Sequence, residues 1–150
     1  MSIDVDKIKK LKEETGAGVL EVKKALEEFD GDVERAKKEL LSKASEKASK
    51  KADRDAGDGL VYSYIHNGGK VGSMILVACE TDFVAKTDDF KKLCREIAMQ
   101  VCTEDYSDVK KLLESEYIRD PSKTILDLVN EATAKLGEKI EIRDFYKLSV

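Results

Sequence analysis

The segment Cys79–Lys86 (CETDFVAK) places a bulky aromatic side chain, Phe83, directly after an acid, Asp82, where an apolar run ends. Residues 71–78 are rich in β-forming types and residues 87–90 open a helical pattern, so the segment is predicted to connect a strand to a helix. Connections held by rigid elements at both ends often carry function. One interpretation of this pair is recognition of another surface. The alternative is that Phe83 folds back into the core and Asp82 caps a turn.

Residue types that carry covalent catalysis are scarce. His66 is the only histidine, and its place beside an expected hairpin turn favours an exposed or partly packed side chain over a general base. Cys94 and Cys102 lie eight residues apart on one expected helix, which separates them by about 12 Å, too far for one zinc ion. Gly69-Lys70 superficially resembles a phosphate loop, but Val71 follows instead of Ser or Thr. We therefore expect no enzyme activity, no cofactor and no metal.

Length and composition set further bounds. The 150 residues suit one compact domain with a small appended module. The sequence shows neither a membrane-spanning run nor a signal-peptide pattern. Cys79, Cys94 and Cys102 lie in apolar patterns without paired spacing, which favours reduced thiols and a cytoplasmic location. A net charge of −4 with 39% charged residues indicates an acidic protein whose partners are proteins rather than nucleic acids.

Three short amphipathic helices are predicted in the N-terminal part. Apolar residues recur there at helical spacing in three groups: Val5, Ile8 and Leu11; Val19, Val22, Leu26 and Phe29; Val33, Ala36 and Leu40. Between the second and third groups, Gly31 suits a left-handed helix end and Asp32 suits the cap of the next helix. Residues 42–54 then become rich in Ala, Ser and Lys. This composition indicates a solvated helical linker, with RNA contact as the alternative.

The remainder alternates strand and helix patterns. Residues 60–66 and 71–79 are predicted strands, and Asn67-Gly68 between them favours the positive backbone angles of a tight hairpin turn. Helical stripes follow over residues 90–101 and 125–136, the second ending at Gly137.

A third strand is predicted from Lys139 onward. Five apolar residues share one parity there, with Phe145 on the opposite face: Ile140, Ile142, Tyr146, Leu148 and Val150. We expect helices to cover one face of a three-stranded sheet.

Several motifs resemble the elongation factor Ts family, in the family's own order and over nearly the whole chain. They are Thr15–Leu26 (TGAGVLEVKKAL), Lys47–Arg54 (KASKKADR), Tyr64–Gly68 (YIHNG), Cys79–Lys86 (CETDFVAK) and Tyr117–Thr124 (YIRDPSKT). Each alone is a weak signal, but together they are specific. The family supplies the guanine-nucleotide exchange factor for elongation factor Tu in bacterial and organellar translation. The resemblance implies that this protein binds elongation factor Tu in its GDP-bound and nucleotide-free states and promotes GDP release.

The resemblance and the patterns together imply an α+β fold. Residues 1–45 are expected to form a three-helix module like the ubiquitin-associated fold, which binds the GTPase. Residues 46–58 are expected to be a basic helical linker. Residues 59–150 are expected to form a helix-covered, three-stranded antiparallel sheet, a shortened version of the family's dimerisation-type domain.

The resemblance also implies which residues contact the GTPase. In the family, the strand-to-helix connection inserts beside the magnesium and phosphate region of the GTPase, which here assigns Asp82 and Phe83 to the inserted pair. Thr81 shapes the turn, and Val84 completes the contact segment. The magnesium ion belongs to the partner.

The family's N-terminal module contacts the GTP-binding domain, which by position implies roles for Lys12, Val19, Leu20 and Lys23. Val19 has an alternative place in the core, and the lysines have an alternative as solvated charges. Family members often carry Arg in place of Lys12 and Met in place of Val19 and Leu20, so this contact differs from the common pattern.

A long section usual in the family is missing after Val101, so its contacts are not carried over. Short relatives tend to form homodimers, and we expect one here. Two other functions stay open. A protein-binding adaptor without exchange activity predicts binding that survives loss of Phe83, and RNA binding through residues 43–54 predicts steep salt dependence.

Overall fold

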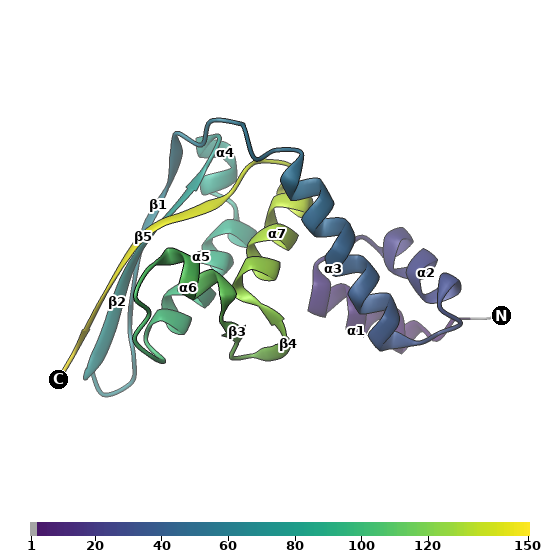
Figure 1. Cartoon of the computed structure of the whole chain (residues 1–150), viewed down its shortest axis with the longest axis horizontal. Coiled ribbons are helices and arrows are strands. Elements are labelled where there is room, and N and C mark those ends of the chain that lie inside the picture. The colour runs from purple at the N-terminus through teal and green to yellow at the C-terminus, as the bar shows by residue number, and fades with distance from the viewer. Residues whose placement is uncertain (1–2) are drawn as a thin grey trace.

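The computed structural model describes residues 3–150 (Figure 1). Its helices and strands, in chain order, are α1 (Val5–Thr15), α2 (Val19–Glu28), α3 (Val33–Ser49), β1 (Asp58–Ile65), β2 (Val71–Cys79), α4 (Asp82–Ala85), α5 (Asp88–Val101), α6 (Val109–Glu114), β3 (Glu116–Tyr117), β4 (Asp120–Thr124), α7 (Ile125–Leu136) and β5 (Glu141–Ser149). Three helices precede a mixed region of strands and helices. The predicted α+β class is confirmed.

Helices α1, α2 and α3 form the N-terminal module around a small apolar core. The buried members of this core are Leu11, Val22, Ala25, Leu26, Ala36 and Leu40. Gly31 has a φ of 80°, and the Asp32 carboxylate accepts a hydrogen bond from the backbone N–H of Arg35 at 3.1 Å. The predicted helix stop and cap are therefore confirmed. Helix α3 continues without a break to Ser49, so the first residues of the expected linker extend the third helix.

The main sheet has the strand order β1-β2-β5, and both pairings are antiparallel. Figure 1 shows α5, α6 and α7 on one side of this sheet, and the N-terminal module beyond α7. Helix α7 therefore lies between the sheet and α3. The predicted three-stranded sheet, covered by helices on one face, is confirmed.

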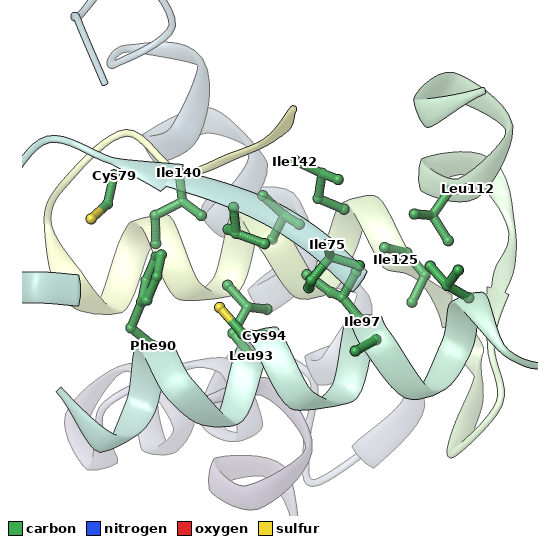
Figure 2. Close-up of a cluster of buried hydrophobic side chains, with 14 of the residues drawn as sticks. Ile75, Cys79, Phe90, Leu93, Cys94, Ile97, Leu112, Ile125, Ile140 and Ile142 are labelled. Atoms are coloured by element: carbon green, nitrogen blue, oxygen red, sulfur yellow. The ribbon is translucent and has the colours of Figure 1, made fainter. Parts of the chain in front are cut away.

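The larger core lies between the sheet and helices α5 and α7. Figure 2 shows Phe90, Cys94 and Ile97 of α5 in the same cluster as Ile75 of β2 and Ile125 of α7. All five side chains are at most 1% exposed. Helix α5 begins at a Thr87 cap, whose hydroxyl accepts from the backbone N–H of Phe90 at 3.2 Å. The helical stripes predicted from the sequence therefore face this core.

Strand β5 differs from the expected alternation because it contains a bulge. Leu76 of β2 pairs with Asp144 and the next residue, Val77, pairs with Ile142, so Arg143 is an extra residue in β5. An extra residue reverses the parity of everything that follows it. Ile140 and Ile142 are buried as predicted, whereas Phe145 turns inward and Tyr146 and Leu148 turn outward. The prediction of one shared face for residues 140–150 is wrong.

The β1–β2 hairpin is present, but its turn differs from the predicted one. The backbone N–H of His66 donates to the carbonyl of Val71 at 2.9 Å and closes the hairpin. Positive φ values occur at Gly68 (87°) and Gly69 (69°), and not at Asn67. The longer connection lets two glycines, which lack a Cβ, adopt the left-handed conformation without steric cost.

The connection between α5 and α7 contains α6, β3 and β4, which the sequence patterns did not predict. The buried side chain of Gln100 fixes this connection. Its Nε2 donates to the Tyr106 hydroxyl (3.0 Å) and the Glu116 carbonyl (2.9 Å), and its Oε1 accepts from the backbone N–H of Ile118 (3.1 Å). One amide thus supplies polar partners that the irregular backbone needs at a buried place.

Two buried lysines, Lys123 of β4 and Lys37 of α3, join the N-terminal module to the core. Lys123, only 5% exposed, donates to both carboxylate oxygens of Glu131 in α7, at 2.8 and 2.9 Å. The same ammonium donates to the backbone carbonyl of Glu14, at the end of α1, at 2.5 Å. Lys37 of α3 contacts Asp120 at 2.6 Å and the Glu14 carboxylate at 3.3 Å. The junction therefore depends on two lysines without free access to water.

Replacement of Lys123 by Ala is expected to destabilise the protein by about 3–5 kcal/mol, because it leaves the Glu131 carboxylate buried without a counter-charge. The control is Lys135→Ala, which removes an exposed pair with Asp89 and is expected to cost at most about 1 kcal/mol. Urea unfolding followed by circular dichroism measures both. Equal losses of stability in the two variants would contradict a specific role for the buried pair.

Candidate functional site

The segment predicted as a strand-to-helix connection is a single helical turn, α4, between β2 and α5. Thr81 caps it in an extended conformation, and its hydroxyl oxygen accepts from the backbone N–H of Val84 at 3.4 Å. Ala85 is buried, and Val84 packs against the main core. The turn is therefore anchored on one side only, and its other side projects into solvent.

Phe83 lies on the projecting side of α4 and is 79% exposed. The alternative in which Phe83 plugs the core is therefore wrong. Asp82 is the first residue of α4 rather than its cap, and it pairs with Lys86 at 3.0 Å. The hydrogen bond from the Lys86 ammonium lowers the pKa of the Asp82 carboxyl. The exposed end of α4 thus presents an aromatic ring beside a carboxylate that is ionised at neutral pH.

A carboxylate from a distant part of the chain holds the start of α4. Glu138 Oε1 accepts from the backbone N–H groups of Glu80 (3.1 Å) and Thr81 (3.0 Å), and Oε2 accepts from the Thr81 hydroxyl (2.7 Å). Sequence reasoning did not identify Glu138, because it lies 57 residues beyond Thr81. The only local signal is that it follows Gly137, the helix stop of α7.

The second group of predicted contact residues lies on the N-terminal module. Leu20 is 74% exposed at the start of α2, and Lys12, Val19 and Lys23 are exposed as well. Val19 is therefore not a core residue. Lys23 is a neighbour of both Val19 and Leu20 on the helix surface, because it lies four and three positions after them. Lys12 lines a cavity of about 350 Å³ together with the connection from Gly16 to Gly18 that leads into α2.

The structure keeps the two groups of contact residues apart. Helix α4 lies at the end of the sheet where β1 begins and β2 ends, and α2 lies on the side of α3 that faces away from the sheet (Figure 1). The residues therefore form two separate surfaces on a rigid frame. A single partner that touches both must be large enough to extend past α3 and α7.

Among residues 3–150, no group of three or more His, Cys, Asp or Glu residues is placed to hold a metal ion. Burial raises the pKa of Cys79 to about 11 and that of Cys94 to about 12. Both thiols are therefore protonated at neutral pH. His66 is exposed and its Nδ1 lies 3.1 Å from the Tyr64 hydroxyl.

The basic segment proposed as an alternative RNA contact is partly neutralised by neighbouring acids. Lys43 pairs with Glu39 at 3.7 Å and Lys47 with Glu21 at 2.5 Å. Arg54 pairs with Glu80 at 3.5 Å. These pairings reduce the positive charge that a phosphate backbone requires.

No helix among residues 3–150 combines the length and the apolar character needed to cross a membrane.

The comparisons with known proteins agree with one another. The family model described as "Elongation factor TS" matches residues 80–150. The chain is 40% identical to "Elongation factor Ts" of Herpetosiphon aurantiacus, with 100% of this chain and 98% of that protein covered. The protein belongs to the elongation factor Ts family. The proteins of the same name from Coprothermobacter proteolyticus and Thermoanaerobacter sp. (strain X514) are each 39% identical, over 98% and 97% of this chain and 98% and 93% of their own lengths.

Compared with this elongation factor Ts relative, the chain is short. The alignment with the Herpetosiphon protein extends over 195 positions, although this chain has 150 residues, so about 45 of the relative's residues have no counterpart here. The sequence predicts that the missing section follows Val101. The structure has α6, β3 and β4 in that region, held by Gln100.

The three thiols are expected to differ in reactivity. Cys79 and Cys94 are buried, whereas Cys102 is partly exposed. Because a protonated, buried thiol reacts slowly, we expect one thiol in the native protein to react rapidly with Ellman's reagent and the other two only after unfolding. Cys102→Ser should remove the rapid phase. A rapid phase that persists in this variant would contradict the burial of Cys79 and Cys94.

Proposed function

We propose that this protein is a guanine-nucleotide exchange factor for elongation factor Tu in translation elongation. It binds the GDP-bound form and promotes GDP release by inserting Asp82 and Phe83 near the magnesium and phosphate site of the GTPase. The observation that carries this proposal is the exposed Phe83 ring on an anchored helical turn, in a chain that belongs to the elongation factor Ts family. The function needs no covalent step and no cofactor of its own.

The physical basis of the exchange is linkage between two binding events. If the protein binds nucleotide-free elongation factor Tu more tightly than the GDP form, bound GDP must weaken the protein's binding by the same factor. The coupling arises when Phe83 and Asp82 displace groups that hold magnesium and phosphate in the partner. GDP then leaves faster, and the cell's excess of GTP over GDP determines the direction of exchange.

Helix α4 suits this task because it is already ordered before binding. Its capped start at Thr81 and its buried Ala85 fix the backbone, so little conformational entropy is lost when the partner binds. Burial of an exposed aromatic ring by a partner makes the free energy of binding more favourable. The ionised Asp82 beside it brings a negative charge to a site where the partner holds an anion and a cation.

The N-terminal module supplies the second contact of the proposed complex. Leu20 and Val19 present apolar surface, and Lys12 and Lys23 are cations exposed on the same module. Such a surface suits an amphipathic partner element with acidic residues at its edge. Because α4 lies apart from this surface, the N-terminal contact holds the GTPase while Phe83 acts. The boundaries 1–45, 46–58 and 59–150 and the likeness to the ubiquitin-associated fold stay predictions.

The open face of the main sheet supports a homodimer. Six apolar side chains from three strands are exposed on the face that the helices leave uncovered: Val61, Ile65, Met74, Leu76, Tyr146 and Leu148. Neighbouring strands align them in rows. A second copy related by a twofold axis would place the same apolar surface on both sides and bury it. A contiguous patch of this kind is rarely left in water by a monomer.

Phe83→Ala and Asp82→Ala are expected to slow the release of a fluorescent GDP analogue from elongation factor Tu by about tenfold or more, because loss of a central contact in an interface costs about 2 kcal/mol or more. Stopped-flow fluorescence measures the rate. Ile118→Ala is the matched control, since Ile118 is also an exposed apolar residue but lies in the connection between β3 and β4. Folded wild-type protein that fails to accelerate release, while still binding through the module without Phe83, would favour the adaptor function instead.

Leu148→Asp is expected to convert the protein from dimer to monomer in sedimentation velocity at tens of micromolar. Leu148 is 83% exposed, so the substitution leaves the folded chain intact but places a charge in the proposed interface. Leu20→Asp changes a similarly exposed residue on the N-terminal module and should leave the dimer unaffected. A wild-type protein that sediments as a monomer would rule out this use of the sheet.

A further inference from the structure

The start of α4 carries polar backbone groups that neither the sheet nor the helix satisfies. Strand β2 ends at Cys79 and α4 begins at Asp82, so the N–H groups of Glu80 and Thr81 lie between the two hydrogen-bond ladders. Partly buried N–H groups need an acceptor. The acceptor is the carboxylate of Glu138, which takes both N–H groups on one oxygen, at 3.1 and 3.0 Å.

The second oxygen of Glu138 controls the cap of α4. The Thr81 hydroxyl has one proton, and it donates this proton to Glu138 Oε2 at 2.7 Å. The hydroxyl oxygen is then oriented with a lone pair free to accept from the backbone N–H of Val84. Hydrogen bonds from such donors to an ionised carboxylate are stronger than those to a neutral acceptor. Glu138 therefore acts on α4 through Thr81.

Glu138 is itself held in place by the surrounding chain. It follows Gly137, which ends α7 with a φ of 76°, and Figure 1 shows the connection from α7 to β5 passing beside α4. Arg54 donates to the carbonyl of Gly137 at 3.4 Å and pairs with the Glu80 carboxylate at 3.5 Å. The start of α4 and the α7–β5 connection are thus linked twice, once through Glu138 and once through Arg54.

We propose that Glu138 is a positioning residue for nucleotide exchange: it holds the turn so that Phe83 and Asp82 meet the partner in one orientation. This inference rests on the proposed function. Glu138 contacts neither Phe83 nor Asp82 in its hydrogen bonds, so it acts through the backbone of residues 80 and 81. Loss of Glu138 leaves the N-terminal contact surface unchanged and loosens only the inserted element.

The functional test distinguishes binding through the N-terminal module from insertion of Asp82 and Phe83 into the partner. The rate of GDP-analogue release from elongation factor Tu is measured at increasing concentrations of each variant. Glu138→Ala is expected to lower the maximal release rate by about tenfold to a hundredfold, the usual effect of a small misplacement of an acting group. The concentration for half-maximal rate should stay within about twofold, because the module's contacts are intact. Glu138→Asp should recover part of the rate, and Glu138→Gln should fall between wild type and Ala.

The controls address folding and coupling. Glu141→Ala removes a nearby carboxylate that pairs with Arg143 but does not touch the turn, and it should leave the maximal rate unchanged. Glu138→Gln keeps the size of the side chain and serves if the Ala variant fails to fold. Thr81→Val combined with Glu138→Gln should lose no more rate than the stronger single variant, since both act on the same cap.

A second measurement tests how firmly α4 is held in the absence of elongation factor Tu. Amide hydrogen exchange by NMR in Glu138→Ala or Glu138→Gln is expected to accelerate by about tenfold at residues 84–86, with α5 and α7 unchanged. Unchanged protection at residues 84–86 overturns the proposal, as does an equal loss of release rate in Glu141→Ala. If the wild-type protein fails to accelerate GDP release from elongation factor Tu, the proposed function is overturned. The hydrogen-exchange measurement still decides whether Glu138 holds the turn.

Discussion

The buried ammonium group of Lys123 joins three parts of the molecule. It contacts the carboxylate of Glu131 in α7 and the last turn of α1 through the Glu14 carbonyl, and it is itself the residue before the cap of α7. Helix α7 lies between the sheet and α3, so its polar groups on the inner side have no access to water. A charge at this place is tolerated only because its partners are fixed. The relative position of the N-terminal module and the sheet depends on this constraint.

Two separate contact surfaces depend on that junction for their relative position. The exposed residues of α2 and the exposed ring of Phe83 on α4 share no direct contact. Helices α3 and α7 pack against each other between α2 and the sheet (Figure 1). A protein that distorts its partner at one contact while binding it at another needs its contact surfaces held at a fixed separation. The hydrogen bonds that Glu138 accepts also hold the turn that carries Phe83.

The connection after α5 is the place where the sequence predicts that a section is missing. About 45 residues of the Herpetosiphon relative have no counterpart in the chain. The segment that closes the connection consists of α6, β3, β4 and the turns between them, and the backbone groups of these turns need partners at a partly buried place. Gln100 supplies them with both ends of its amide, donating to the carbonyl of Glu116 and accepting from Ile118. The same segment also contributes to the main core, where Leu112 of α6 and Tyr117 of β3 are buried.

Patterns of short range were readable from the sequence, because the physics that produces them is local. The caps at Gly31 and Asp32, the hairpin strands and the stripes of α5 and α7 all follow from neighbouring residues, whereas the exposed position of Phe83 was decided only by the structure. The face of β5 beyond Arg143 was not readable, because its bulge exists only relative to β2. Nor was Glu138, because its partners lie 57 and 58 residues away. The sequence by itself determined the N-terminal helices, the strands of the main sheet, helices α5 and α7 and the recognition motif. Only the tertiary structure decided which faces meet and which carboxylate holds the motif, since pairing register and long-range hydrogen bonds depend on chain segments that meet only in the folded state.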